Sequence, residues 1–217
     1  MAGFTAVTFN FSGSGVGEDG ESFTELERWG HQTLTGDLAD LAMVVDYAVA
    51  QGAPWVGLLG HSRGGGMAIL HAAHDPRVKA LATWAAVSGF ARWPAEDVER
   101  WRRDGKIDVV NLRTGQVLPV FLDLLRDLEK NRATLDPLHA ASRLVIPWLI
   151  VHGTADESVP LDDGEALRRA SRSERTELLL VEGAGHTFGV KHPWAGTTPE
   201  FDRVLEHTLR LLISALP

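Results

Sequence analysis

The chain has 217 residues, of which 44% are hydrophobic, and we expect residues 1–217 to form one domain around a single core. Its formal net charge of −8 and its pI near 5.6 disfavour nucleic acid or an anionic membrane as the main partner. The chain contains no cysteine, which excludes disulfides, a thiolate nucleophile and a cysteine-based zinc site. It shows neither a leader pattern nor an apolar run of membrane length, so a cytoplasmic location is predicted.

The first part of the chain combines a strand-like run, a glycine-rich loop and a helix. Phe4–Asn10 has the residue types of a β-strand, whereas Phe11–Gly17 contains too many glycines for a regular element. No Lys-Ser/Thr pair follows these glycines, so they do not predict a phosphate-binding loop. Apolar residues recur at helical spacing in Asp37–Ala50, and Gly52 and Pro54 are expected to end that helix.

The segment Gly60-His61-Ser62-Arg63-Gly64 lies between an apolar run and a stretch of small residues. We expect Trp55–Leu59 to be a strand and Ser62 to occupy the sharp turn into a helix, with its hydroxyl exposed and its backbone strained. Gly60 and Gly64 are expected because side chains there would collide with the neighbouring strand and helix. The alternative interpretation is a glycine-rich turn with a chance serine. The strand–turn–helix context favours a nucleophile.

The later part of the chain alternates strands with helices. Val78–Val87, Leu144–Gly153 and Glu177–Val181 are the predicted strands. The last helix is expected to begin at Thr198 as its N-cap, with Pro199 as its first helical residue. This alternation predicts an α/β fold with a mostly parallel sheet and helices on both faces.

Two polar residues come just after predicted strands, at the edge where open α/β sheets place their ligands. They are Asp156, after the strand that ends at Gly153, and His186, after the strand that ends at Val181. The chain order Ser62, Asp156, His186 is that of α/β-hydrolases and differs from that of chymotrypsin and subtilisin. On the segments GHSRGG, HGTADESVP and GAGH, the sequence resembles the α/β-hydrolase superfamily.

The resemblance implies a role for each of these residues. Ser62 would be the nucleophile and His186 the general base that takes its proton. Asp156 would fix the tautomer of His186 and stabilise its positive form. The backbone N–H of Arg63, at the start of the helix, would stabilise an oxyanion.

Other readings of these and neighbouring residues stay open. Asp156 is also a common turn former, and Glu157 is its nearest competitor for the acid position, with Glu182 more distant. His71 and His74 resemble a metal-binding pair, but the sequence places no third ligand near them, so a solvated helix end is the better interpretation. No metal and no cofactor is predicted.

The stretch Phe90–Ser142 interrupts the alternation of strands and helices. Pro94–Arg103 and Pro119–Lys130 are predicted helices, and Lys106–Val120 is predicted to be a hairpin that turns around Arg113–Gly115. In α/β-hydrolases this location commonly carries a cap over the active site, and we expect residues 90–142 to be a cap insertion. The alternative is an ordinary crossover helix with long loops, which are rare in compact domains.

Compared with the family pattern, the front end is missing. Two or three strands and a His-Gly-type oxyanion loop usually precede the segment that Phe9–Gly15 resembles. The absent loop would supply the second oxyanion N–H, unless another loop does, and loss of one donor costs on the order of 10²–10³ in rate. We therefore expect either an upstream segment of a longer protein or a second copy of the chain to fill the gap.

The resemblance implies a serine carboxylic-ester hydrolase acting on short-chain or aromatic acyl esters. The sequence resembles those of feruloyl esterases, dienelactone hydrolases and the catalytic domains of prolyl-oligopeptidase-like peptidases. One alternative is an acyl-aminoacyl or prolyl-oligopeptidase-like peptidase. Another is a non-catalytic remnant that keeps the triad but lacks a complete oxyanion hole. The expected partner is a small-molecule ester.

Overall fold

The computed structural model describes residues 3–20, 22–111 and 114–216. The chain divides into two compact units. The first unit contains Met1–Phe4, Val45–Phe90 and Asp136–Pro217, and the second contains Thr5–Val44 and Ala91–Leu135. Most of the predicted cap therefore belongs to the second unit. The predictions of a single domain and of a cap stay predictions.

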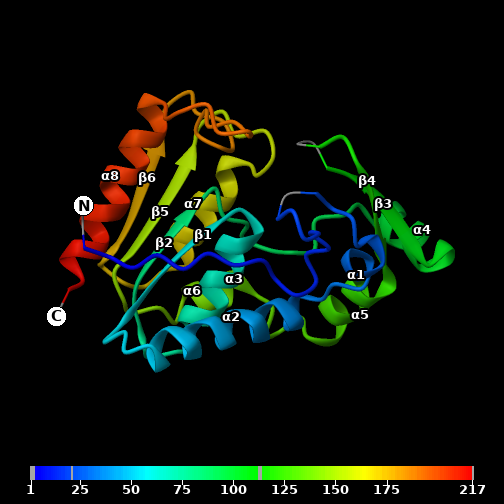
Figure 1. Ribbon diagram of the computed structural model, residues 1–217, viewed down its shortest axis with the longest axis horizontal. Coiled ribbons are helices and arrows are strands. Elements are labelled where there is room, and N and C mark those ends of the chain that lie inside the picture. The colour runs from blue at the N-terminus through cyan, green and yellow to red at the C-terminus, as the bar shows by residue number, and fades with distance from the viewer. Residues whose placement is uncertain (1–2, 21, 112–113, 217) are drawn as a thin grey trace. The chain divides into compact units, whose positions relative to one another are not determined.

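The first unit is built on a parallel sheet (Figure 1). Within the described residues the sheet has four strands in the order β1-β2-β5-β6, and each neighbouring pair is parallel. The strands are β1 (Val56–His61), β2 (Val78–Trp84), β5 (Trp148–Gly153) and β6 (Thr176–Val181). Because all four run in one direction, the loops after them meet at the same edge of the sheet.

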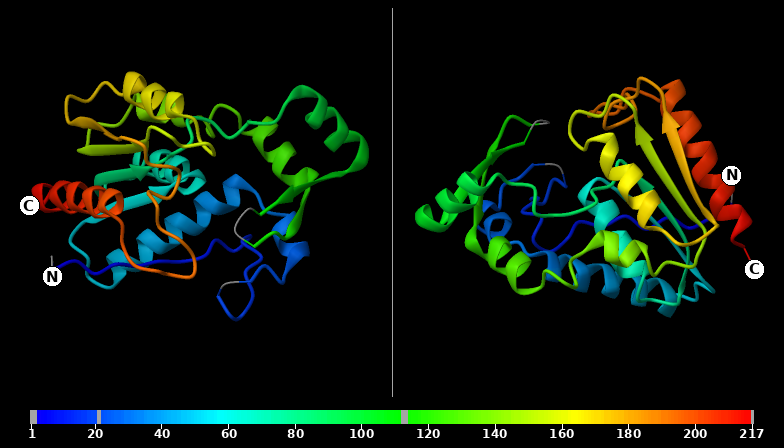
Figure 2. Two further views of the ribbon diagram at one scale, coloured as in Figure 1. Left: turned by 90° about the horizontal axis from the view of Figure 1, so that it is seen from above. Right: turned by 180° about the vertical axis from the view of Figure 1, so that it is seen from behind.

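Helices lie on both faces of this sheet, as Figure 2 shows. On one face α3 (Arg63–Ala72) packs on β1 and β2, and α7 (Leu161–Ala170) packs on β5 and β6, with α6 (Pro137–Ala141) against both helices. On the other face α8 (Pro199–Ser214) packs on β2 and β5. The predicted fold class, a mostly parallel sheet with helices on both faces, is confirmed.

The core of the first unit surrounds its central strand β5, all six residues of which are buried. On the α8 side, the buried cluster includes Leu149, Val151, Phe188 and Val204. The predicted start of α8 is confirmed: the Thr198 hydroxyl accepts a hydrogen bond from the N–H of Phe201, and Pro199 is the first helical residue.

Two strands are shorter than predicted, each for a local reason. The strand expected to reach Val87 ends at Trp84 because Ala85 has a φ of 47°, which turns the chain out of the sheet. The strand expected from Leu144 begins at Trp148. Pro147 has no N–H to donate to a ladder, and Leu144 closes a turn after α6 through a bond from its N–H to Ala141.

The predicted strand Phe4–Asn10 is wrong, because no strand is assigned there. Strand-type residues form a strand only when a neighbouring strand supplies hydrogen bonds and packing. Among the described strands, β1 pairs with β2 and stands at one edge of the sheet. Leu59 of β1 is 48% exposed. That an upstream segment or a second copy covers this edge stays a prediction.

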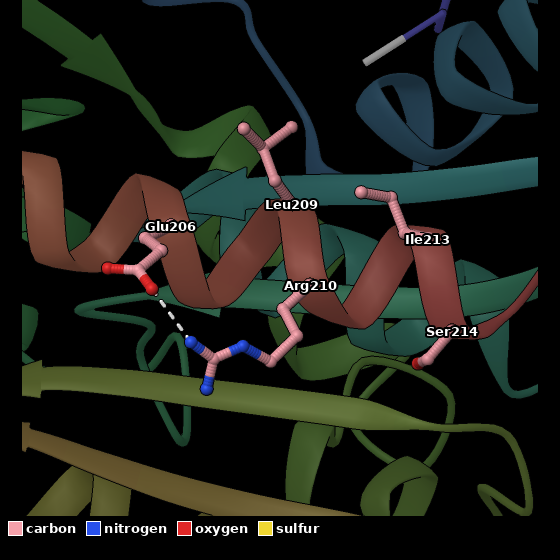
Figure 3. Close-up of a pocket in the computed structure, with 5 residues that line it drawn as sticks. All are labelled: Glu206, Leu209, Arg210, Ile213 and Ser214. Carbon is pink, nitrogen blue, oxygen red and sulfur yellow. Dashed lines mark hydrogen bonds and ion pairs between the residues drawn. The ribbon is translucent and has the colours of Figure 1, made fainter.

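The outer surface of α8 carries a shallow hollow, drawn in Figure 3. Its volume is about 450 Å³, and the side chains around it are Glu206, Leu209, Arg210, Ile213 and Ser214. Arg210 donates a hydrogen bond to Glu206 at 2.7 Å. None of the residues predicted for catalysis lines this hollow, so it plays no part in the site described below.

The second unit contains α1 (Leu26–Gly30), the start of α2 (Leu34–Ala50), α4 (Ala95–Asp104), β3 (Lys106–Val110), β4 (Val117–Phe121) and α5 (Leu122–Lys130). The helix of α4 and the hairpin of β3 and β4 are confirmed. Of the predicted turn residues Arg113–Gly115, Arg113 lies outside the described residues. The start of the helix predicted at Pro119 is wrong, because Pro119 to Phe121 belong to β4 and pair with β3.

In the described part of the chain, no helix combines the length and the apolar character needed to cross a membrane.

Candidate active site

Ser62 lies on the turn between β1 and α3, in a strained conformation. Its φ is 55° and its ψ is −124°, a region that residues other than glycine rarely adopt. The turn is tied to the next strand, because the N–H of Ser62 donates to Trp84 at 2.9 Å and its carbonyl accepts from Val87 at 3.3 Å. The carbonyl also accepts from Gly65 in the first turn of α3, at 3.0 Å. The strained serine that the sequence predicts is confirmed.

The glycines around Ser62 permit this turn, although they are not the pair that was predicted. A Cβ on Gly60 would lie 2.3 Å from the carbonyl oxygen of Gly64, so only glycine fits there. A Cβ on Gly65 would lie 2.5 Å from the Cβ of Ala86. At Gly64 a Cβ would meet no atom within 4 Å, so the expected collision there is wrong. The tight contact between helix and sheet is one residue further along the chain.

Asp156 lies in the loop after β5, with both carboxylate oxygens occupied. Oδ1 accepts hydrogen bonds from the N–H groups of Ser158 and Val159, each at 2.9 Å. Oδ2 accepts a hydrogen bond from Nδ1 of His186 at 2.8 Å. Burial disfavours the charged carboxylate, but the bonds from Val159, His186 and Ser158 outweigh it and lower the pKa of Asp156 below its ordinary value. The carboxylate is therefore ionised at neutral pH.

His186 lies in the loop after β6 and reaches both of the other strand ends. Its Nδ1 must carry a hydrogen to donate to Asp156, which leaves Nε2 as the basic nitrogen. The side chain of His186 is 21% exposed, so the imidazole is only partly covered by the rest of the chain. Nε2 of His61, the residue before Ser62, donates to the carbonyl of His186 at 2.9 Å, and the two imidazole centres are 4.5 Å apart. The structure thus brings the Ser62 turn, Asp156 and His186 together at one edge of the sheet.

The competing acids are placed differently. Glu157 and Glu182 are both exposed, whereas Asp156 is buried and bonded to His186. Arg63 is the first residue of α3, so its N–H belongs to the first turn of that helix, where N–H groups point away from the helix body. The oxyanion role of Arg63 stays a prediction.

Backbone strain gathers at this edge. Among the described residues other than glycine, those with positive φ are Ser62, Ala85 and Phe188, which follow β1, β2 and β6. Ala85 and Phe188 are fully buried, so surrounding packing holds them in place. Strained residues of this kind cluster at functional sites, because the surrounding structure must over-determine them.

Sequence reasoning missed two contacts that shape the site. The first is the bond from Nε2 of His61 to the carbonyl of His186, between residues 125 positions apart. Asp163 of α7 accepts hydrogen bonds from both the N–H and the hydroxyl of Ser88, each at 2.7 Å, which ties the loop after β2 to α7. The sequence carries no signal for this second contact, because the two residues are 75 positions apart.

The histidine pair of the HAAH segment bonds elsewhere. His71 bonds Asp75 through Nε2 at 3.0 Å, and His74 donates from Nδ1 to the carbonyl of Leu70 at 3.0 Å. In the described residues no group of three or more His, Asp or Glu side chains is arranged to hold a metal ion.

A model of the prolyl oligopeptidase family matches residues 1–212, which is nearly the whole chain. The chain belongs to that family. A curated relative is the 2,6-dihydropseudooxynicotine hydrolase of Paenarthrobacter nicotinovorans, 27% identical over 185 residues. The matched part makes up 83% of this chain and 44% of the relative, so the chain spans less than half of that protein's length.

The fold of this chain is similar to that of solved structures of hydrolases. An esterase domain from Rhodothermus marinus matches with a TM-score of 0.57 at 18% identity, over 86% of this chain and 70% of that one. A monoacylglycerol lipase from Paleococcus ferrophilus matches with a TM-score of 0.65 at 16% identity, over 86% of this chain and 77% of that one. These likenesses, together with the family match, confirm the α/β-hydrolase fold that the motifs around Ser62, Asp156 and His186 predicted.

Proposed function

We propose that the chain carries the catalytic site of a serine hydrolase that cleaves carboxylic esters with short or aromatic acyl groups. The observation that carries this proposal is the 2.8 Å hydrogen bond from His186 to the buried Asp156, beside the strained turn of Ser62. A serine, a histidine and an acid at the ends of three strands are the parts that acyl transfer requires. Membership of a hydrolase family and the esterase among the structural neighbours support the same reaction class.

In the proposed reaction, Oγ of Ser62 attacks the ester carbonyl while Nε2 of His186 takes the hydroxyl proton. The tetrahedral oxyanion is stabilised by N–H donors, for which the N–H of Arg63 is the candidate. Collapse breaks the bond to the alcohol, which leaves with the proton from His186. Water then attacks the acyl-enzyme by the same route, giving the carboxylic acid and free Ser62. Asp156 stays ionised throughout and stabilises the positive form of His186.

A peptidase is the second candidate, because the family match is to prolyl oligopeptidases. The two candidates share the proposed triad and differ in the leaving group, an alcohol in one and an amine in the other. Substrate preference therefore separates them, whereas mutation of Ser62 does not.

The test is a series of p-nitrophenyl acetate, butyrate and decanoate beside an aminoacyl anilide, with Ser62→Ala as the matched control. We expect the acetate and butyrate to be hydrolysed with the highest kcat/KM and the Ser62 variant to give no turnover above background. Preferential cleavage of the anilide would replace the esterase by the peptidase. Turnover of neither class would refute both and leave a non-catalytic remnant.

A further inference from the structure

His152 is a fully buried histidine on the central strand that the proposed reaction does not use. It is the fifth residue of β5, and its side chain has 0% exposure. Its Nε2 lies 2.9 Å from the carbonyl oxygen of Val159 and 3.7 Å from Oδ2 of Asp156. The imidazole therefore lies directly beneath the loop that carries Asp156.

The hydrogen bonds of Val159 show what His152 does to this loop. The N–H of Val159 donates to Oδ1 of Asp156 at 2.9 Å, and its carbonyl accepts from His152. Both backbone groups of one residue are thus fixed, one by the carboxylate and one by β5. Loss of the bond from His152 would release the carbonyl of Val159, and with it the N–H that orients Asp156.

The bonding pattern also fixes the tautomer of His152. A carbonyl oxygen only accepts, so Nε2 carries the hydrogen. Nδ1 is then a bare acceptor, and it is buried without a hydrogen-bond partner. Burying this unpaired nitrogen costs stability that an apolar side chain would not lose, so the bond from Nε2 to Val159 is what a histidine provides here and an apolar residue cannot.

The helix on the other side of the ring is shaped to this histidine. A Cβ on Gly164 of α7 would lie 2.6 Å from Nδ1 of His152. Glycine inside a helix costs up to about 1 kcal/mol relative to alanine, so its presence here needs a packing reason. Close contact with the imidazole is that reason.

We propose that His152 is a positioning residue that holds the Asp156–Val159 loop so that Oδ2 of Asp156 faces His186. This inference rests on the proposed function, because the residue that His152 positions is the acid of the proposed triad. His152 touches neither the substrate nor Ser62 in this scheme. It acts through the carbonyl of Val159.

The first test compares His152→Leu with His152→Gln in the whole chain. Leucine fills the space without a donor, whereas the side-chain amide of glutamine can donate to Val159. A misplacement of about 1 Å can cost on the order of 10²-fold, so we expect kcat of the leucine variant to fall by ~10–100-fold with KM unchanged. The glutamine variant should recover most of this loss. Wild-type kcat in the leucine variant, or equal loss in both, would overturn the proposal.

The second test uses Gly164→Ala, with Gly89→Ala as the matched control. A Cβ on Gly89 meets no atom within 4 Å, whereas one on Gly164 meets the imidazole. We expect only the Gly164 variant to lower kcat. In a His152→Ala background the 2.6 Å contact with Nδ1 is gone and only a 3.2 Å contact with the Cβ of residue 152 is left, so Gly164→Ala should cost much less than in the wild type. An equal loss of kcat with and without the His152 side chain would contradict the positioning role of His152.

A spectroscopic readout separates failure of this inference from failure of the proposed function. Long-range ¹⁵N–¹H spectra of the imidazoles should show His152 as the Nε2–H tautomer. The Nδ1–H signal of His186 should be present in the wild type and the glutamine variant and lost in the leucine variant. An unchanged His186 signal in the leucine variant would refute the positioning role, whatever the activity. An inactive wild type with these expected spectra would refute only the esterase.

Discussion

The His186–Asp156 pair and the His71–Asp75 pair contain the same two side chains in the same unit, at 2.8 Å and 3.0 Å. Their surroundings differ. Asp156 receives two backbone N–H bonds besides that from His186, whereas Asp75 is held by the guanidinium of Arg77 through both of its oxygens. Arg77 holds the pKa of Asp75 far below its ordinary value. A carboxylate already neutralised by arginine has little charge left to stabilise an imidazolium.

Position separates the two pairs further. His71 lies near the end of α3, eight residues beyond the first residue of that helix, so it is roughly 12 Å along the helix from Arg63. His186 instead touches His61, the neighbour of Ser62. A hydrogen-bonded histidine and aspartate are thus not evidence of catalysis by themselves. The proposed catalytic pair is distinguished by a free ring nitrogen at the carboxyl edge of the sheet, beside a strained serine.

The largest expected difference is between the two histidines. His186→Ala should lower kcat by on the order of 10⁶ if the triad acts as a unit, because no base then remains for Ser62. His71→Ala should leave kcat unchanged and lower only the melting temperature. Steady-state kinetics on a p-nitrophenyl ester give both numbers. A comparable loss in the His71 variant would remove the distinction between the pairs.

The aspartates should differ in the same direction with a smaller effect. Asp156→Asn should lower kcat by on the order of 10⁴, because an amide no longer holds His186 in the required tautomer. Asp75→Asn should leave kcat unchanged. Glu157→Gln serves as the neighbouring control, since Glu157 is exposed. A loss in the Glu157 variant as large as that in the Asp156 variant would show that the acid is Glu157.

The packing of the Ser62 turn, which lies beside the His186–Asp156 pair, can be tested through the glycines of that turn. Gly60→Ala should destabilise the fold by about 1–3 kcal/mol, because the new Cβ would overlap the carbonyl of Gly64. Gly64→Ala should not destabilise it, since a Cβ there meets open space and alanine favours a helix. Urea unfolding of the two variants makes the comparison. Equal destabilisation would mean that the turn is not packed as described.

The smallest expected effect is the pH dependence of the Asp75 contribution. Because the pKa of Asp75 is lowered on folding, its ion pair stabilises the fold above the unfolded value of 3.8 and this contribution is lost as pH falls below it. Asp75→Asn should therefore lower the free energy of unfolding by about 1 kcal/mol at pH 7 and by progressively less below pH ~4. The effect is modest because Arg77 is partly exposed, and solvent weakens its attraction to Asp75. Thermal unfolding at pH 7 and pH 3 measures this difference. A cost that grows on acidification would contradict the direction of the pKa shift.

The motifs of the sequence predicted which residues lie together at the sheet edge better than they predicted the limits of the strands. Ser62, Asp156 and His186 could be named because each follows an apolar run at a strand end, and strand ends of a parallel sheet converge. Strand limits at Trp84 and Trp148 depend on the φ of Ala85 and on a missing N–H at Pro147, which patterns of hydrophobicity do not reveal.

Contacts over long separations in the chain were out of reach of sequence reasoning. The bond from His61 to the carbonyl of His186 joins residues 125 positions apart. The strand-like pattern of Phe4–Asn10 misled in the opposite way, because composition alone does not supply a partner strand. Local motifs could therefore be recognised in the sequence, whereas contacts between distant segments could not.

The most direct test of the central claim is covalent labelling by a fluorophosphonate followed by peptide mass spectrometry. The probe reports an activated serine whatever the preferred substrate, so it is independent of the choice between esterase and peptidase. We predict one phosphonyl adduct, on Ser62, with labelling abolished by Ser62→Ala and greatly slowed by His186→Ala. An adduct on a different residue, or no adduct on the folded wild-type chain, would contradict the assignment of Ser62 and His186 as a catalytic pair.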